Sequence, residues 1–187
     1  GVRGGSATVH FPIWHQEIED ILVLKNNKGT EDNRVRKLDY SIQITKLFYE
    51  RFIKNADITL FSPNHVPGLY EAFGMPEFDS LYLKYEKDKS IPRQTIGAQE
   101  LFMSLLKERA ETGRIYIMNL DHCNTHSSFK DKVYMSNLCQ EITLPTTPVQ
   151  HIDDKEGEIA LCILSAINLG LLTDMNELEE LCDLSVR

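Results

Sequence analysis

The stretch from Gln94 to Leu120, QTIGAQELFMSLLKERAETGRIYIMNL, carries the clearest structural signal of the chain. Residues 94–112 have the apolar spacing of an amphipathic helix. Gly113 follows where a helix is expected to end, because glycine adopts the left-handed conformation without strain. Residues 114–120 then alternate in the manner of a strand. A helix followed directly by a strand is the unit from which α/β proteins are built.

The same alternation extends toward the N-terminus. Strands are expected at residues 7–14, interrupted at Pro12, and at 58–61. Helical segments are expected at residues 17–25, 40–54, 66–73 (a helical turn beginning at Pro67) and 78–85. The helix 40–54 is predicted from a stripe of apolar residues: Ile42, Ile44, Leu47, Phe48 and Phe52. Strands that alternate with helices predict an α/β fold with parallel pairing.

The C-terminal part continues the pattern less regularly. A polar connector is expected over residues 121–135 and a charged turn over 153–157. Residues 159–169 form a nearly continuous apolar run, which predicts a strand buried on both faces. A final helix is expected after Thr173 and Asp174.

Composition narrows the class of protein. The chain has 187 residues, 42% hydrophobic and 26% charged, which is the composition of a globular domain with a sizeable core. No apolar run reaches the roughly 18 residues that span a bilayer, and no signal peptide is apparent. The net charge of −8 gives no reason to expect direct binding to nucleic acid or to a membrane.

Four cysteines, Cys123, Cys139, Cys162 and Cys182, are widely spaced and form no CxxC pair. This pattern argues against a framework of structural disulfides. A reducing cytoplasm is the location expected from it.

The segment Ser136–Pro145, SNLCQEITLP, places an amide, a thiol and a carboxylate at alternating positions: Asn137, Cys139 and Glu141. In an extended strand or loop these three side chains would point the same way, whereas on a helix they would scatter. The β-branched residues at 142 and 143 and the closing Pro145 favour the extended form. The trio is therefore a candidate active site.

Cys139 allows more than one interpretation. A free cysteine is often a small buried hydrophobe, but an apolar core would not accommodate Asn137 and Glu141 beside the sulfur. A nucleophilic thiolate would need a nearby positive charge or helix N-terminus, and the local sequence offers neither. One-electron chemistry at a neutral thiol meets no such objection.

A metal site is the competing hypothesis for the segment that begins at Asp121. His122, Cys123 and His126 carry zinc-type ligands, and a helix would bring the two histidines together. Asn124 and Thr125 argue against a helix there, and no HExxH pattern or further ligand cluster is found. No metal is therefore expected on this chain.

Several long strings resemble one family in the same order. They are GVRGGSAT, LVLKNNKGTEDNRVRKLDY, DITLFSPNHVPGLYEAF, ERAETGRIYIMNLDHCNTH, SNLCQEITLP and GEIALCILSAINLG. Together they resemble the large (alpha, catalytic) subunit of class I ribonucleotide reductase, along essentially the whole chain. The resemblance implies part of a ten-stranded α/β barrel, with the catalytic cysteine on a finger loop at its centre.

The resemblance also implies residue roles in the reduction of ribonucleoside diphosphates to 2′-deoxyribonucleoside diphosphates. Cys139 would become the thiyl radical that takes the 3′-hydrogen of the ribose. Glu141 would accept the proton of the 3′-hydroxyl, and Asn137 would hydrogen-bond the sugar. Cys162 would be one half of the redox dithiol. Arg3 and Leu138 would join the trio in contacting substrate.

Partners and cofactors follow from the same resemblance. No cofactor is expected on this chain itself; a metal-containing small (beta) subunit would supply the radical, and thioredoxin or glutaredoxin the reducing equivalents. Nucleoside triphosphate effectors and a second large subunit are the other expected partners. Cys123 and Cys182 match no catalytic position and are interpreted as structural.

Both ends of the chain look cut, so residues 1–187 are interpreted as an internal fragment of the catalytic barrel without a separate ATP-cone domain. The fragment alone is expected to be inactive. Two alternatives stay open at this point. One is an unrelated thiol enzyme that uses Cys139 and Glu141, and the other is a non-catalytic structural piece of a split reductase.

Overall fold

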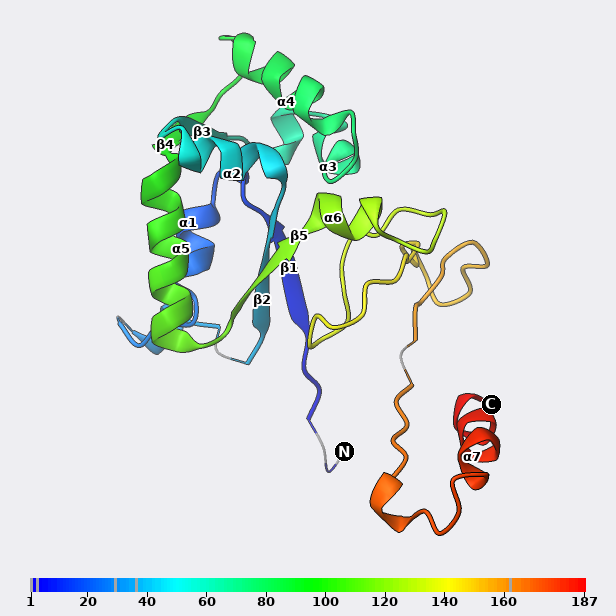
Figure 1. The fold of residues 1–187 in the computed structure, drawn as a ribbon. Helices are drawn as coiled ribbons and strands as arrows, with labels where there is room; N and C mark the ends of the chain where they lie inside the picture. Colours follow the sequence, from blue (N-terminus) through cyan, green and yellow to red (C-terminus); the bar gives the residue numbers. More distant parts are fainter. Residues whose placement is uncertain (1, 3, 29, 36, 162) are drawn as a thin grey trace.

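Two small sheets and seven α-helices make up the computed structural model, which describes residues 2, 4–28, 30–35, 37–161 and 163–187 (Figure 1). The strands are β1 (Thr8–Pro12), β2 (Asp39–Ile44), β3 (Asp57–Leu60), β4 (Gln94–Gly97) and β5 (Ile115–Asn119). The helices are α1 (Ile18–Leu22), α2 (Lys46–Ile53), α3 (Leu69–Ala72), α4 (Phe78–Lys87), α5 (Ala98–Thr112), α6 (Leu120–Thr125) and α7 (Glu177–Val186). Short 3-10 turns occur at Glu31–Asn33, Pro63–His65 and Leu169–Leu171.

The main sheet has the order β1-β2-β5, and both of its pairings are parallel. β3 and β4 form a separate antiparallel pair. Helices separate the parallel strands along the chain, as parallel pairing requires. The expectation of an α/β fold with parallel pairing is therefore confirmed.

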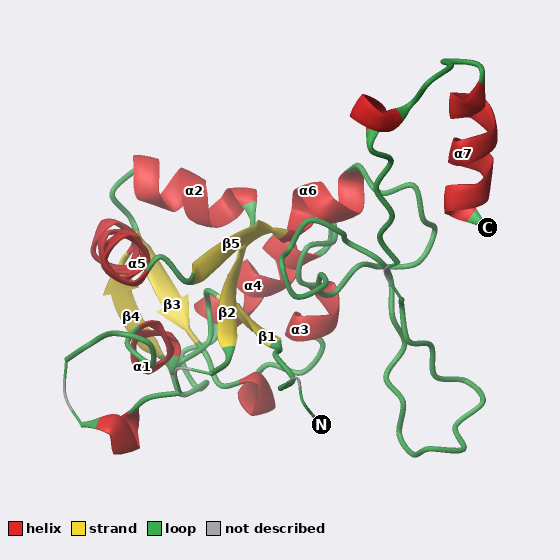
Figure 2. Cartoon of the chain, turned by 90° about the horizontal axis from the view of Figure 1, so that it is seen from below, coloured by secondary structure: helices red, strands yellow, loops and turns green. Residues whose placement is uncertain are grey.

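The two faces of the main sheet differ in chemistry. Cross-strand partners share a face, so His10 lies with Ser41, and Gln43 follows two residues later on the same side. Ile42 and Ile44 point to the other side, where they are fully buried in the core. Figure 2 shows helices α1, α2 and α5 on the apolar side of the sheet, away from the loop that follows α6.

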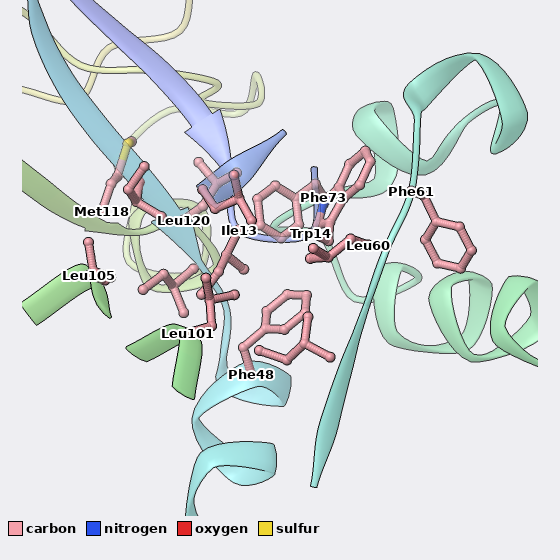
Figure 3. Close-up of a cluster of buried hydrophobic side chains, with 14 of the residues drawn as sticks. Ile13, Trp14, Phe48, Leu60, Phe61, Phe73, Leu101, Leu105, Met118 and Leu120 are labelled. Atoms are coloured by element: carbon pink, nitrogen blue, oxygen red, sulfur yellow. The ribbon is translucent and has the colours of Figure 1, made fainter. Parts of the chain in front are cut away.

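The core is rich in aromatic side chains that join the sheet to the helices (Figure 3). Phe48 of α2 packs edge-to-face on Tyr82 of α4, with ring centroids 5.5 Å apart. Phe73 contacts both Phe78, at 4.7 Å between centroids, and Trp14 after β1, at 6.0 Å. Edge-to-face and tilted rings are the favourable arrangements for such pairs. This cluster packs α2, α4 and the segment that follows β1 against one another.

The predicted single helix over residues 40–54 is wrong. Residues Asp39–Ile44 form strand β2, and only Lys46–Ile53 are helical. The apolar residues at 40, 42 and 44 also fit the period of a strand, and pairing with β1 and β5 on both sides decides in its favour. Ser41 and Gln43 are buried as well, so β2 is covered on both faces.

Smaller differences concern element ends. The expected helix 94–112 begins only at Ala98, because residues 94–97 pair with β3. Helix α3 begins at Leu69 rather than at Pro67. The connector 121–135 begins with helix α6, which the sequence analysis did not expect. The strands at 7–14, 58–61 and 114–120, the helices near 17–25 and 78–85 and the cap at Gly113, with φ 65°, are confirmed.

The predicted buried strand at 159–169 is also wrong. The described residues of this run form no strand, and Ile163 is 91% exposed. An apolar run predicts burial, but it does not identify the surface that would cover it. No described strand pairs with the described residues of this run. The expected turn at 153–157 is present, where the Asp154 carboxylate accepts the N–H of Glu156. The expected C-terminal helix is present as α7.

Among the described residues, no helix is both long and apolar enough to cross a lipid bilayer.

Candidate active site

The segment that carries Cys139 is a tight loop. The backbone N–H of Asn137 donates to the oxygen of Ile142 at 3.1 Å, and the N–H of Ile142 donates to Asn137 Oδ1 at 3.0 Å. Inside this pair, the N–H of Gln140 donates to the oxygen of Asn137 at 3.2 Å. Gln140 adopts a left-handed conformation, with φ 64°. These bonds reverse the chain direction between residues 137 and 142.

The reversal corrects the expected extended arrangement of the trio. Cys139 and Glu141 are both exposed, but they occupy a turn and not successive positions on one face of a strand. Asn137 is partly buried at the base of the turn, where its side-chain oxygen holds the loop together. Extended pairing needs a neighbouring strand, and here the segment bonds to itself. The three residues therefore share one turn: Asn137 lies at its base, and Cys139 and Glu141 are exposed on it.

All three strands of the main sheet hold the loop in place. Thr8 Oγ1 at the start of β1 donates to the Leu138 oxygen at 2.7 Å. Ser41 Oγ of β2 donates to Gln140 Oε1 at 3.0 Å. Gln140 Nε2 in turn donates to the Ile117 oxygen of β5 at 3.0 Å. The loop therefore lies across the polar face of the sheet.

Two further contacts fix the segment that leads into the loop. Gln43 Nε2 of β2 donates to the Tyr134 oxygen. The backbone N–H of Ser136 donates a weak hydrogen bond to His10 Nε2 of β1, with 3.5 Å between the two nitrogens. Burial lowers the pKa of His10, which favours the neutral ring that can accept this N–H. The groups that contact the loop from the sheet are thus uncharged.

A largely apolar cavity of about 350 Å³ lies beside the base of the loop. Asn137 and Ile142 line it from the loop, and Val149 and Ile159 line it from the segment that follows. Cys139 and Glu141 do not line it. A second hollow of about 360 Å³ lies on the side of Gln140 and Thr143, next to α6. The loop is therefore accessible from two sides.

Two other cysteines, Cys123 and Cys182, lie within the described residues. Cys123 lies half-buried in α6, where burial and then the nearby Asp121 carboxylate raise the pKa of its thiol. Cys182 is exposed on α7. Cys162 and Arg3, both expected at the site, lie outside the described residues.

His122 of α6 and His126, the residue directly after this helix, are closer together than the sequence analysis expected. Since Leu120–Thr125 is helical, the rings of His122 and His126 meet edge-to-face with centroids 5.8 Å apart. His126 Nδ1 is 3.1 Å from the backbone oxygen of His122. Within the described ranges, no group of three or more His, Cys, Asp or Glu side chains is arranged to hold a metal ion.

Sequence reasoning missed the residues that support the loop. Thr8, Ser41, Gln43 and Gln140 were not singled out as functional. A signal was present in residues 40–44, where polar side chains at 41 and 43 alternate with apolar ones. An alternating polar row on a buried strand indicates that a polar partner covers that face.

The fold and the loop can now be compared with known proteins. The sheet is parallel, and the loop across its polar face carries Asn137, Cys139 and Glu141. The whole chain, residues 1–187, matches the model of the family described as ribonucleotide reductase, barrel domain. The chain belongs to this family. The expected α/β-barrel class is thereby confirmed.

Individual relatives carry more specific names. The chain is 60% identical over 181 residues to the ribonucleoside-diphosphate reductase subunit alpha of Haemophilus influenzae, covering 94% of this chain and 24% of that protein. It is 60% identical over 154 residues to the ribonucleoside-diphosphate reductase 1 subunit alpha of Escherichia coli, covering 80% and 20%. It is 45% identical to the subunit alpha of Enterobacteria phage T4, covering 100% and 26%. The chain thus spans about a quarter of the length of the curated relatives it matches.

Proposed function

We propose that residues 1–187 belong to the catalytic barrel of a ribonucleoside-diphosphate reductase large subunit and carry its radical cysteine. The observation that supports this most directly is the loop geometry. Cys139 and Glu141 are exposed at a turn that hydrogen bonds tie to β1, β2 and β5. A reacting group must be both accessible and held in place, and this loop provides both conditions.

Cys139 would act as a thiyl radical. Its sulfur takes a hydrogen atom from C3′ of the ribose, so that an S–H bond forms and the radical moves to carbon. Thr8, Ser41 and His10, which contact the loop from the described sheet, supply no positive charge of the kind that a thiolate needs, and this supports chemistry at a neutral thiol. The radical itself would come from the metal-containing small subunit.

Glu141 would serve as the general base for the 3′-hydroxyl, a role that an exposed carboxylate next to the radical residue can perform. Asn137 would orient the sugar. Its Oδ1 already accepts the Ile142 N–H, which directs its amide N–H groups away from that bond and makes them available to a substrate oxygen. Leu138, which lies between Asn137 and Cys139 in the sequence and is 39% exposed, would contact the substrate.

Cys162 and Arg3 complete the proposed site by resemblance to the family. Cys162 would supply one thiol of the dithiol that reduces C2′ and is left as a disulfide, which thioredoxin or glutaredoxin would then reduce. Arg3 would contact the substrate from a glycine-rich loop and transmit the effect of bound nucleoside triphosphates. A second large subunit would complete the assembly.

The test uses the full-length large subunit together with its small subunit, with conversion of a ribonucleoside diphosphate to its deoxy form as the readout. Cys139→Ser should abolish turnover, because a serine hydroxyl cannot serve as the radical carrier. Glu141→Gln should lower kcat by about 100-fold or more, as expected for loss of a general base. Cys182→Ser, which removes an exposed thiol on α7, is the matched control and should retain activity. Retention of turnover by Cys139→Ser would refute the proposal.

A further inference from the structure

We propose that Gln140 is a positioning residue of the reaction: its side-chain amide clamps the loop to β2 and β5 and so sets the places of Cys139 and Glu141. This inference rests on the proposed function. Gln140 lies between the two reacting residues in the sequence, so its backbone conformation determines how both of them leave the turn.

The backbone of Gln140 is the first observation. Among the described residues other than glycine, only Asn55 and Gln140 have positive φ, at 49° and 64°. A residue with a Cβ adopts this conformation only where its surroundings favour it. Here the conformation directs the side chain of Gln140 to the sheet while Cys139 and Glu141 stay exposed.

The second observation is the pair of bonds that the amide makes. Ser41 Oγ donates to Oε1, and Nε2 donates to the Ile117 oxygen, both at 3.0 Å. A backbone carbonyl can only accept, so the amide nitrogen must face Ile117 and the amide oxygen must face Ser41. The two bonds therefore define one orientation of the side chain, and they join strands that are adjacent in the sheet.

The bond to Ser41 is sheltered from water at the Ser41 end. Ser41 is fully buried, and Gln140 is partly buried between the loop and the sheet. A hydrogen bond removed at such a place leaves the remaining partner without water to replace it. Loss of the amide would therefore leave the Ser41 hydroxyl and the Ile117 carbonyl to seek other partners, and the turn would be free to shift.

The experiment uses the full-length large subunit with its small subunit. Gln140→Leu keeps a similar size but can form neither bond, and we expect kcat to fall about 10- to 100-fold, the size of effect that a small displacement of reacting groups produces. KM should change by less than about twofold, because binding energy shared by ground and transition state is retained. Gln99→Leu is the matched control. Gln99 lies on helix α5, away from the loop, and its side-chain amide also donates to a backbone oxygen, that of Phe52.

A second readout distinguishes positioning from simple support of the fold. Gln140→Glu keeps an acceptor for the Ser41 hydroxyl. When the new carboxylate is ionised, however, one of its oxygens faces the Ile117 oxygen, and two acceptors cannot form a hydrogen bond. On protonation it regains an O–H donor. The activity of Gln140→Glu relative to the unaltered protein should therefore rise as the pH falls. The thermal midpoint, measured in parallel, identifies any loss due to unfolding.

The outcomes separate this inference from the proposed function. A folded Gln140→Leu variant with unaltered kcat would refute the positioning role, provided that Cys139→Ser is inactive. An active Cys139→Ser variant would instead refute the proposed function. If Gln140→Leu does not fold, Ser41→Ala decides the question, because it removes only the donor to Oε1 and should lower kcat in the same direction. Unaltered kcat in a folded Ser41→Ala variant would then refute the role.

Discussion

The hydroxyl of Thr8 donates a hydrogen bond to the backbone oxygen of Leu138, 2.7 Å away in space and 130 residues away in sequence. Thr8 begins β1, and Leu138 lies in the turn next to Cys139. The start of the first strand thus holds the loop that carries the proposed radical residue.

Replacement of Thr8 by valine keeps the side-chain shape and removes this bond. We expect amide hydrogen exchange at residues 137–142 to become faster, while the free energy of unfolding falls by about 1 kcal/mol or less. Hydrogen exchange followed by mass spectrometry measures the first effect, and urea denaturation the second. Thr173→Val, which removes an exposed hydroxyl bonded to Glu177, should leave exchange in the loop unchanged. Equal exchange in the Thr8→Val variant would contradict the anchoring role.

The ion pair between Arg51 and Glu86 gives a prediction on pH. Burial alone would raise the pKa of Glu86, but hydrogen bonds from Arg51 and Thr59 outweigh it and hold the pKa below its ordinary value. A lowered carboxylate pKa stabilises the fold above the unfolded value of about 4.3, and this contribution is lost as the pH falls through the folded pKa. Glu86→Gln should therefore reduce the loss of stability below about pH 4.3.

The matched control is Glu50→Gln, because the ion pairs of Glu50 with the exposed Lys46 and Lys54 are longer, at 3.7 Å. Glu50→Gln should change the stability at pH 7 by less than about 1 kcal/mol, because exposed ion pairs contribute little. Arg51→Met should cost about 3 kcal/mol at pH 7, because it leaves the mostly buried Glu86 without its counter-ion. A Glu86→Gln titration identical to that of the unaltered chain would exclude this pair as a source of acid sensitivity.

The buried hydroxyl of Tyr82 satisfies both backbone groups of Thr59. It accepts the Thr59 N–H at 2.9 Å and donates to the Thr59 oxygen at 2.7 Å. Tyr82→Phe should lower the free energy of unfolding by about 1–3 kcal/mol, because both groups lose their partner in a site without water. Tyr85→Phe removes an exposed hydroxyl bonded to the Pro67 oxygen and should cost clearly less. Thermal or urea unfolding gives the comparison, and equal losses would contradict the explanation.

Two glycines with positive φ predict different costs for the same substitution. At Gly113, φ 65°, an added Cβ meets open space, so Gly113→Ala should cost only the backbone penalty of roughly 1–2 kcal/mol. At Gly74, φ 82°, the added Cβ would lie 2.6 Å from Leu120 Cγ, whose side chain is buried. Gly74→Ala should therefore cost about 1–3 kcal/mol more than Gly113→Ala. Equal unfolding free energies for the two variants would contradict this prediction and show that the Leu120 side chain moves aside without cost.

Local signals in the sequence predicted the elements that depend on short-range chemistry. The Gly113 cap and the strand that follows it were predicted because helix ends and alternating strands have signatures within a few residues. The segment 40–54 was misassigned because its apolar residues fit two periods, and the strand partners at residues 8–12 and 115–119 decide between them. The alternation at residues 40–44 was compatible with a strand, but only the tertiary pairing decides between the two periods.

The candidate site was predicted by residue type and not by geometry. The importance of Asn137, Cys139 and Glu141 was inferred from their chemistry, and their roles stay predictions. Their turn was not foreseen, because Ser41 and Ile117, which bind the Gln140 side chain at the turn, lie far away in the sequence. The same limit applies to the apolar run at 159–169. Its pattern indicates that these residues are suited to burial, but it does not identify the surface that would cover them.

The anchors of the loop also have a consequence for the order of folding. The bonds from Thr8, Gln43 and Ser41 to the loop segment close separations of 130, 91 and 99 residues. Contacts between such distant residues form late, because the entropy of closing long loops is lost before the contact stabilises anything. We therefore expect the turn at Cys139 to be anchored only after the parallel strands have paired. During synthesis and refolding, the proposed radical residue would be among the last parts of this chain to become ordered.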